Sequence, residues 1–478
     1  MNDNNKLSLG LASLPLITMI VLFALGAAFL EMNNEVLLLI MLSAAVVATM
    51  VAQRVGKSWD DVQRSTGDKL AAALPALLIL LSIGMLIGTW VCSGTIPLMV
   101  YYGLKLVNPN YLAVTAFLAT SAMSICTGTS WGSAGTIGVA LMGMAAALGA
   151  PLAPMAGAIV SGAYFGDKMS PLSDSTNIAA IGAGSHLYRH IRLMVYTSGP
   201  SYLIAGIVYL IAVKVPGSSS ALPPAAQRLL DELSSIYSLS AIALLPIIIV
   251  VIGIARRTPP VIAIVISSAV AALTGMALQG FSLTSVLMSA VQGFNVTMLA
   301  DKGLDPRSLE ADTLALLNRG GMYSMSNTLL LIIAAFLLAG AMDVSGALDR
   351  LINQLLKMVN STFALIAATM ASGLAMISLT SNNGVTCLVV GELFQKAYDE
   401  RGFARENLSR SMEDSVTIVE PLLPWTVSAV YMATTLGVPT ISYAPWAFFC
   451  FGGPIFSLLY AATYDRLGFG LKRAVVDG

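Results

Sequence analysis

The chain of 478 residues consists largely of apolar runs, each close to the length that a helix needs to cross a bilayer. A transmembrane helix takes about 20 predominantly apolar residues. Hydrophobic residues make up 56% of the chain and charged residues only 10%, whereas soluble domains carry about 25% charged residues. We therefore expect an all-α polytopic membrane protein with roughly 11 to 14 spans, some of them interrupted. The clearest runs are Leu14–Leu30, Val36–Ala52, Leu70–Val91, Leu193–Val213, Leu239–Ala255, Val261–Leu278, Leu329–Met342 and Ala444–Ala462.

Positive charges indicate how the chain threads the bilayer, because Lys and Arg favour cytoplasmic loops. The loop expected after the second run, Arg54–Lys69, is basic, whereas the first loop, Glu31–Glu35, has no positive residue. We expect both termini in the cytoplasm and Leu14–Leu30 as a retained helix rather than a signal peptide. The other basic stretches expected inside are His186–Arg192, Arg256–Arg257, Lys396–Arg410 and Arg466–Arg473, and the loops expected outside are Lys214–Tyr237 and Phe281–Gly321.

The second half of the chain repeats features of the first at a nearly constant spacing. Gly88–Asn108 aligns with Gly340–Asn360 at an offset of 340 − 88 = 252, and the dipeptides Thr129-Ser130 and Pro171-Leu172 recur as Thr380-Ser381 and Pro421-Leu422. We therefore expect two homologous units. The expected division is a first repeat over residues 1–213, an external linker over 214–237 and a second repeat over 238–478.

The loop charges predict that the two repeats have opposite orientations. The first short loop of repeat one is acidic and is expected outside, whereas its counterpart in repeat two, Ala255–Pro260, holds two arginines and is expected inside. An odd number of spans in each repeat produces this inversion. Inverted repeats with interrupted helices are typical of secondary transporters, whose binding sites lie near the bilayer midplane.

Polar breaks interrupt two of the apolar runs, at SWGSAGT (Ser130–Thr136) and at TSNNG (Thr380–Gly384). Non-helical backbone is tolerated at membrane depth only where it is buried in protein or lines a cavity. Hydroxyls and freed carbonyls are suitable oxygen ligands for a small cation, and half-helix N-termini attract anions. A single break could merely allow close helix packing, but two breaks at matching positions favour a binding site. Its candidate residues are Thr129, Ser130, Thr380, Ser381 and Asn382.

A second polar segment follows each break, Gly162–Ala180 in repeat one and Leu408–Ala429 in repeat two. Ionisable residues within a membrane are costly and are functional candidates by default. Some have structural alternatives: Asp167 could pair with Lys168, Asp174 could cap the next helix, and Glu413-Asp414 could be solvated at a cytoplasmic helix end. Glu420 has no polar neighbour in sequence. The candidates from these segments are Asp167, Ser173, Asp174, Asn177, Asp414 and Glu420.

These side chains favour ion-coupled transport with Na⁺ as the transported or coupling ion. A carboxylate in a cavity binds Na⁺ when ionised and a proton when neutral, so competition between the two ions for one site produces Na⁺/H⁺ antiport. The same groups could instead hold a small carboxylate or amino acid that is moved with Na⁺ or H⁺. A channel is the less favoured alternative, because it would not need isolated acids. The expected Na⁺ ligands are Thr129, Ser130, Ser173 and Asp174.

Other classes of function lack support in the sequence. The chain has no HExxH, GxSxG or P-loop motif, and its two histidines, His186 and His190, stand in a basic stretch. We therefore expect no enzyme activity, no cofactor apart from Na⁺ and, at zero net charge, no nucleic-acid partner. The two breaks and two polar segments should meet at the repeat interface. The uniformly apolar first two runs could form a scaffold or the face of a homodimer in the lipid bilayer.

Three stretches resemble one family of transporters. TSWGSAGTIG, GDKMSPLSDSTN and LSRSMED followed by EPLLPW are similar to motifs of the NhaC-type Na⁺/H⁺ antiporter family, within the ion transporter superfamily. The resemblance implies a secondary transporter of the bacterial inner membrane that exchanges Na⁺ for H⁺. Similar proteins exchange malate and lactate or carry amino acids. The positions that match the family's motifs are Thr129, Ser130, Trp131, Gly132, Asp167, Ser170, Pro171, Ser173, Asp174, Asp414, Pro421, Leu422, Pro424 and Trp425.

The chain departs from the family pattern around the second polar segment. Where the family often has a small residue before PLIPW and Asn-Thr after it, this chain has Glu420 before the motif and Thr426-Val427 after it. The additional acid could bind a cationic group of an organic substrate or provide a further proton site.

Overall fold

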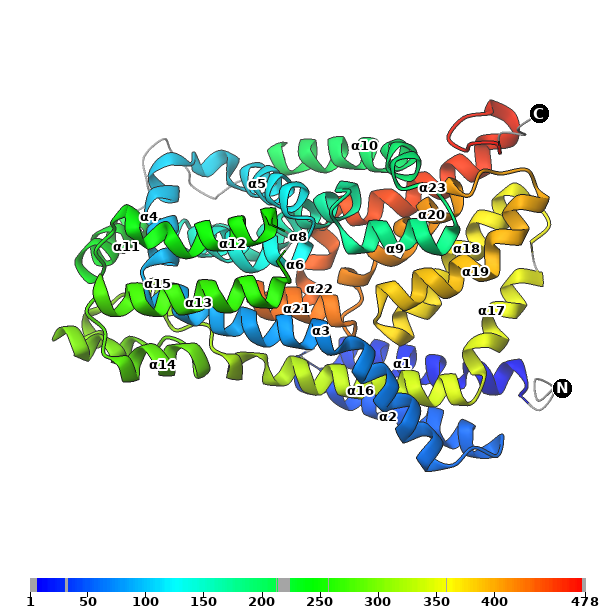
Figure 1. The fold of residues 1–478 in the computed structure, drawn as a ribbon, viewed down its shortest axis with the longest axis horizontal. Coiled ribbons are helices and arrows are strands. Elements are labelled where there is room, and N and C mark those ends of the chain that lie inside the picture. Colours follow the sequence, from blue (N-terminus) through cyan, green and yellow to red (C-terminus); the bar gives the residue numbers. More distant parts are fainter. Residues whose placement is uncertain are drawn as a thin grey trace.

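The computed structural model describes residues 7–30, 33–211, 213, 224–256, 258–357 and 359–474. Over these residues the secondary structure is helical, and the two isolated β-bridges, Phe294–Arg319 and Phe403–Arg473, do not extend into strands (Figure 1). The predicted all-α class is therefore confirmed. Parts of the expected loops and termini lie outside the described residues: 1–6, Glu31 and Met32, 214–223, Arg257 and 475–478.

The first half of the chain contains two long N-terminal helices, one very long helix and a series of shorter ones that surround the centre of the molecule. The helices are α1 (Leu9–Phe29), α2 (Asn34–Arg54), α3 (Trp59–Cys92), α4 (Thr95–Leu106), α5 (Leu112–Thr127), α6 (Ser130–Ser133), α7 (Val139–Ala147), α8 (Leu152–Met169), α9 (Asp174–Ala183), α10 (Leu187–Ile211) and α11 (Pro224–Ile236).

The second half contains a comparable series, with a group of short helices inserted after its second long helix. The helices are α12 (Leu245–Ala255), α13 (Pro260–Ala277), α14 (Leu283–Val291), α15 (Ala311–Leu317), α16 (Ser326–Val344), α17 (Ala347–Lys357), α18 (Thr362–Thr380), α19 (Asn383–Glu400), α20 (Glu406–Met412), α21 (Val427–Leu436), α22 (Thr440–Tyr443) and α23 (Phe448–Leu467).

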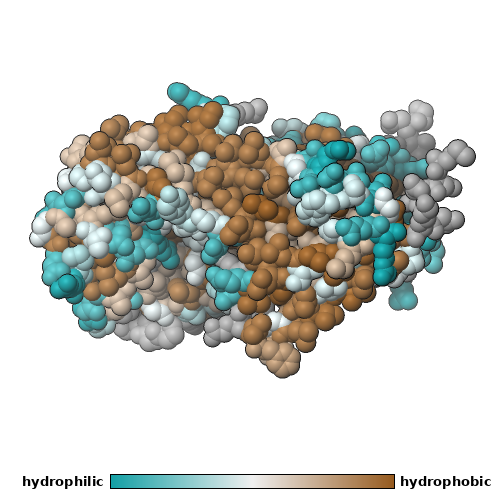
Figure 2. Space-filling view, turned by 90° about the horizontal axis from the view of Figure 1, so that it is seen from below, coloured by the Kyte–Doolittle hydropathy of each residue, from teal (hydrophilic) through white to brown (hydrophobic). Residues whose placement is uncertain are grey.

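The long helices are suited to a membrane. Within the described residues, 7 helices are long and apolar enough to span it, or up to 11 if each bent helix pair counts as one span. This range reaches only the lower end of the sequence estimate. Figure 2 shows one face whose middle is covered with hydrophobic side chains, while hydrophilic side chains gather toward the two ends of the long axis. Large apolar side chains such as Ile20, Leu39 and Leu203 are exposed on the surface, as expected of helices that face lipid.

The helices run mainly along the long axis, so this axis corresponds to the direction across the membrane (Figure 1). Helix α1 begins and α23 ends at one end of the molecule, whereas α11, α14 and α15 lie at the opposite end (Figure 1). This arrangement agrees with a threading in which both termini share one side and the loops around residues 224–237 and 281–321 share the other.

Helix α3 shows where hydropathy misplaced a boundary. The stretch Arg54–Lys69 was expected to be a loop, but α3 begins at Trp59 and continues through the apolar run. Ser58 and Asp61 form a capping box, in which each side chain accepts the backbone N–H of the other residue. Such a box starts a helix regardless of the charge of the residues that follow it, so the loop prediction was wrong for most of this stretch.

Helix α11 lies within the segment that was expected to be an external linker. One of its faces is buried, with Leu229, Leu230 and Leu233 packed inside, and it contacts α4 and α15. Arg228 also forms an ion pair with Glu310 at 3.2 Å. The described part of this linker is therefore an amphipathic helix packed on the end of the bundle rather than a free connection.

Candidate functional site

A cavity of about 730 Å³ lies at the centre of the molecule and is lined by residues from all four polar segments. Both chain breaks reach it, and so do the segments that follow α8 and α20. The structure thus brings together segments that are far apart in sequence. The candidate residues that line it are Thr129, Ser130, Asp167, Asp174, Asn177, Ser381, Asn382 and Glu420.

The first break separates α5 from α6. Helix α5 ends at Gly128, whose φ of 69° lies in the left-handed region, and the Thr129 side chain caps α6 by accepting the Gly132 N–H at 3.2 Å. A Cβ placed on Gly128 would come within 2.6 Å of the Leu172 backbone. Glycine is therefore required twice, for its backbone conformation and for the close approach of the next polar segment.

The second break repeats this geometry without a glycine. Ser381, where α18 ends, has a φ of 46° and is the one non-glycine residue with positive φ in the described chain. Asn382 then caps α19 by accepting the Val385 N–H at 3.0 Å. The buried Ser381 hydroxyl has no hydrogen-bond partner among the described residues. Strained residues of this kind persist mainly at functional sites, and this hydroxyl remains available to a ligand.

Asp167 is the best-organised acid of the cavity. The Ser130 hydroxyl donates to its Oδ2 at 2.7 Å, and the Ser173 hydroxyl donates to its Oδ1 at 2.5 Å. Thr176 donates to the backbone carbonyl of the same residue at 2.9 Å. The carboxylate on α8 is therefore held between the first break and the segment that leads into α9. Ser173 reaches the site through this bond, although it does not line the cavity wall.

Asp174 and Asn177 belong to the start of α9. Asp174 is the first residue of the helix and faces the cavity with an exposed side chain. The side chain of Asn177 donates to the carbonyls of Pro171 at 3.0 Å and Ser173 at 2.7 Å, so it fixes the shape of the segment. The two serine hydroxyls that the sequence assigned to a site with Asp174 are thus organised around Asp167.

Glu420 and Thr380 lie on the repeat-two side. The buried Glu420 faces the cavity from a short 3₁₀ turn, and Thr426 donates to its backbone carbonyl at 2.6 Å. The Thr380 hydroxyl lies 2.9 Å from that of Thr386 and is not part of the cavity wall. Glu420 therefore adds a third acid to the cavity, whereas Thr380 connects α18 to α19.

Asp414, the remaining acid among the candidates, does not line the cavity. It is fully buried and forms an ion pair with Lys168, the residue that the sequence suggested for Asp167. The hydroxyls of Thr197 and Ser457 also donate to its carboxylate, at 3.2 and 2.7 Å. Lys168 and Asp167 are adjacent on α8 and point to different sides of the helix, so each finds a different partner.

Comparison with known proteins identifies the family of the chain. Residues 162–463, which include both polar segments, Gly162–Ala180 and Leu408–Ala429, match the Na⁺/H⁺ antiporter family. The chain belongs to the Na⁺/H⁺ antiporter family. It is a multi-pass membrane antiporter and not an enzyme, and Na⁺ and H⁺ are the ions that its family transports.

The antiporter is similar to curated proteins along nearly its whole length. It is 45% identical over 450 residues to an uncharacterised Na⁺/H⁺ antiporter of Haemophilus influenzae, covering 94% of each chain. It is 35% identical to the Na⁺/H⁺ antiporter NhaC of Alkalihalophilus pseudofirmus, covering 90% of this chain and 92% of the other. A malate-2H⁺/Na⁺-lactate antiporter of Bacillus subtilis is 31% identical, with 87% of each chain covered. Among solved structures, the Alcanivorax borkumensis YdaH transporter aligns with 85% of this chain and 89% of its own at 13% identity and a TM-score of 0.37.

Two ionisable residues of the antiporter are buried where the sequence suggested solvent. Glu413 was expected to be solvated at a helix end, but it is fully buried in a π-helical turn, and neither carboxylate oxygen has a partner among the described residues. His190 was placed in a basic loop, but it lies inside α10 with Nδ1 2.7 Å from the Ser409 hydroxyl. Sequence proximity to arginines suggested solvent, whereas α10 packs against α20 around His190, and the π-helical turn that carries Glu413 packs against α18, α19 and α23.

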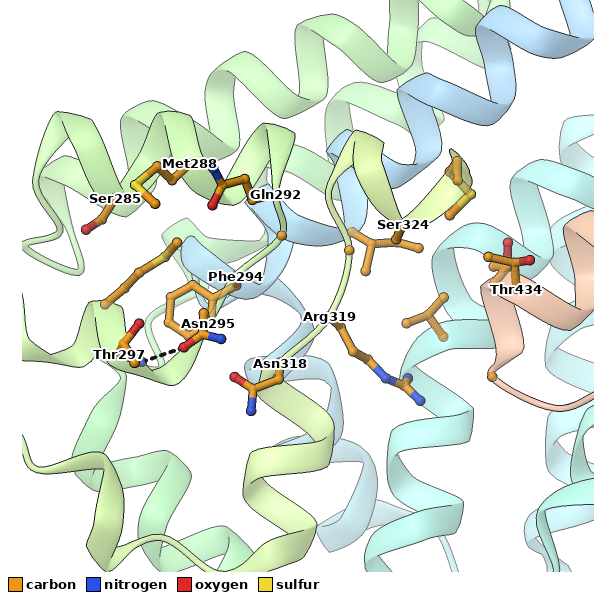
Figure 3. A pocket seen from close by; sticks show the side chains of 18 of the residues that line it. Ser285, Met288, Gln292, Phe294, Asn295, Thr297, Asn318, Arg319, Ser324 and Thr434 are labelled. Atoms are coloured by element: carbon orange, nitrogen blue, oxygen red, sulfur yellow. Dashed lines mark hydrogen bonds between the residues drawn. The ribbon is translucent and has the colours of Figure 1, made fainter. Parts of the chain in front are cut away.

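An aromatic pair that the sequence analysis did not assign stands beside the cavity. The rings of Trp131 and Tyr431 stack with centroids 4.4 Å apart, and the Tyr431 hydroxyl donates to the Trp131 carbonyl at 2.7 Å. Helix α21, which carries Tyr431, starts at the central cavity. Its other end, at Thr434, Thr435 and Gly437, lines a second cavity of about 750 Å³ (Figure 3). The stacked pair therefore lies along the helix that connects the two cavities.

Proposed function

We propose that the central cavity is the site where Na⁺ and H⁺ are exchanged, with Asp167 as the carboxylate that binds either ion. The observation that carries this proposal is the convergence of the Ser130 and Ser173 hydroxyls on Asp167 in a cavity lined by both breaks. Both hydroxyls donate to the carboxylate. They can rotate to turn lone pairs toward Na⁺.

The neighbouring groups complete the proposed ion site. Thr129, Ser130, Ser173 and Asp174 stay in the proposed set of Na⁺ ligands. Ser130 and Ser173 contact Asp167 directly, and Thr129 and Asp174 line the same cavity. A hydroxyl or carbonyl shell suits a hard cation without requiring further charge. Protonation of Asp167 removes the charge that holds Na⁺, so each ion displaces the other and the exchange is coupled at one carboxylate.

The proposed mechanism uses two inverted repeats, residues 1–213 and 238–478 joined by 214–237. Its support is the matched geometry of the two breaks. At the first break, α5 ends at the left-handed Gly128 and the side chain of Thr129 caps the next helix. At the second break, α18 ends at the left-handed Ser381 and the side chain of Asn382 caps the next helix. Two discontinuous helices that face one cavity are typical of alternating-access transporters. One part would rock against the other around the ion site.

We further place the protein in a bacterial inner membrane with both termini in the cytoplasm. The inner membrane is what the resemblance to the NhaC-type family implies. The distribution of Lys and Arg and the position of α1 and α23 at one end of the molecule support the proposed side of the termini (Figure 1). Helices α1 and α2 contact each other and expose apolar side chains, so they remain the proposed face of a homodimer.

The proposed exchange is tested with the purified protein in proteoliposomes that hold an acidic interior and a fluorescent pH dye. Adding Na⁺ outside should collapse the pH gradient, with a rate that saturates as Na⁺ increases. Potassium serves as the control cation. A flux that rises linearly with ion concentration would indicate a channel, and no response to Na⁺ would contradict the proposal.

An organic cargo is the alternative, and two observations favour keeping it. The cavity volume of about 730 Å³ is within the range of about 300–1,000 Å³ of small-molecule sites, and one relative is a malate and lactate antiporter. Na⁺-coupled uptake of labelled carboxylates or amino acids would support this alternative. A response to Na⁺ and pH alone, with no solute present, would favour Na⁺/H⁺ exchange.

Replacing Glu420 by Gln should change the pH dependence of exchange while leaving transport active. Glu420 lines the cavity wall together with Asp167 and Asp174, so removing its ionisable carboxyl alters the field at Asp167 without removing the ion's ligand. The measurement is the exchange rate as a function of pH for both proteins. Glu392→Gln is the matched control, because Glu392 is exposed and lies outside the cavity wall. An unchanged pH profile in Glu420→Gln would assign this residue a structural role only.

A further inference from the structure

The second cavity contains an arginine with an unused donor. Arg319 Nη1 is buried and has no hydrogen-bond partner within the described residues. The backbone of this residue is already paired, because its carbonyl accepts the Phe294 N–H at 2.9 Å. A buried donor of a charged group that lacks an acceptor costs free energy. An acceptor supplied by a ligand in the cavity would remove this cost.

The guanidinium of Arg319 lies beside the end of a helix. Figure 3 shows the Arg319 side chain extending from its loop toward the helix that carries Thr434. Nη2 would lie 3.3 Å from a Cβ placed on Gly437, at the C-terminal end of α21. This end of a helix carries partial negative charge. The helix end therefore attracts the cation but leaves Nη1 without a partner.

Two asparagines provide further donors to the same cavity. Asn295 Oδ1 accepts the Thr297 N–H, and Asn318 Oδ1 accepts the Val296 N–H, both at 2.9 Å. Because each oxygen is occupied by the backbone, the NH₂ groups are what the side chains can offer to a ligand. Figure 3 shows these amides in a different part of the cavity from the tip of Arg319. A ligand that meets both therefore needs polar groups at two ends.

The cavity wall also contains one acid, Asp301, which is engaged by helix α14. Its Oδ2 accepts the Ser282 N–H at 2.9 Å. Hydrogen bonds from the Ser285 side chain and the Ser282 backbone lower the pKa of Asp301, so it stays ionised at neutral pH. The Asp301 carboxylate is therefore occupied by the N-terminus of α14. The polar side-chain groups of the wall that can still bind a ligand are mainly donors.

We propose that the second cavity binds a small organic carboxylate. Arg319 holds the carboxylate group, and Asn295 and Asn318 donate to oxygens at the other end of the ligand. The planar fork of arginine matches a carboxylate with two parallel hydrogen bonds. The volume of about 750 Å³ accommodates an organic acid and is far larger than a bare halide needs.

The test is calorimetric titration of the purified full-length protein in detergent with succinate, using dimethyl succinate as the uncharged control. Succinate should bind saturably and the ester should not. Arg319→Gln should raise the dissociation constant about ten- to a hundredfold, because hydrogen bonds to a charged group are lost. Arg319→Lys keeps the charge but loses the fork, so its dissociation constant should lie between the two.

Two further variants make the test independent of the folding of the arginine variant. Asn318→Asp keeps the oxygen that accepts the Val296 N–H but replaces a donor by a negative charge, so it should also weaken succinate binding. Arg307→Gln is the control, because Arg307 is exposed in the same loop region and lies outside the cavity wall.

The proposal is overturned if the wild-type protein does not bind succinate, or if Arg319→Gln and Asn318→Asp bind it as well as the wild type. If Arg319 only capped α21, its replacement would lower the stability of the protein, and the wild-type protein would not bind succinate. The titration uses no ion gradient, so its result does not depend on whether Na⁺ and H⁺ exchange at the central cavity.

Discussion

Replacing Asp167 by Asn should abolish Na⁺-dependent exchange while leaving the protein folded. Asparagine has the same shape and keeps one oxygen as an acceptor for Ser130 or Ser173, so the local packing survives. It removes the charge that attracts Na⁺ and the group that binds the proton. At about 4 Å and an effective dielectric constant of about 20, one such charge contributes about 4 kcal/mol, which corresponds to about a thousandfold in Na⁺ affinity.

The measurement is the proteoliposome assay together with thermal unfolding in detergent. Asp60→Asn is the control, because Asp60 is an exposed acid at the start of α3, away from the cavity. Asp174→Asn should weaken exchange less than Asp167→Asn, since Asp174 is exposed and is not held by the two serines. If Asp167→Asn kept full exchange activity and Asp174→Asn lost it, the ion-binding carboxylate would be Asp174 rather than Asp167.

The sequence predicted the broad architecture because it depends on local chemistry. Apolar runs without charge form helices wherever they cross the membrane. Residues such as Gly128 and Asn382 interrupt them through backbone freedom and capping that are visible in sequence. The two breaks and their common cavity could therefore be anticipated. The start of α3 could not be read from hydropathy, because a capping box, Ser58 with Asp61, sets it.

The roles of individual acids could not be predicted, because they depend on partners that packing selects. Asp167 and Lys168 are neighbours in sequence, yet the first contacts Ser130 and Ser173 and the second contacts Asp414, 246 residues away. Successive residues on a helix point about 100° apart, and only the arrangement of α8 among its neighbours decides what each meets. The environment of Arg319 could not be predicted either, because a charged residue in a loop is expected to be solvated unless its packing is known.

Replacing Lys168 by Met should destabilise the protein by about 3–5 kcal/mol, because it leaves the carboxylate of Asp414 buried without its cation. Both side chains are fully buried, so water cannot take the place of the lost partner. The pair connects α8 to the π-helical turn after α20, which belong to the two halves of the chain. The measurement is the free energy of unfolding, or the midpoint of thermal unfolding, of the purified protein in detergent.

The double variant Lys168→Met with Asp414→Asn separates the loss of an interaction from the cost of an unpaired charge. Asparagine keeps an oxygen for the hydroxyls of Thr197 and Ser457 but carries no charge. Removing both charges of a buried pair is often neutral, so the double variant should recover most of the stability that Lys168→Met loses. Lys396→Met, at an exposed surface pair, should change stability by about 0.5 kcal/mol or less. If Lys168→Met were as stable as the wild type, or if the second change destabilised it further, the pair would not balance a buried charge between the two halves.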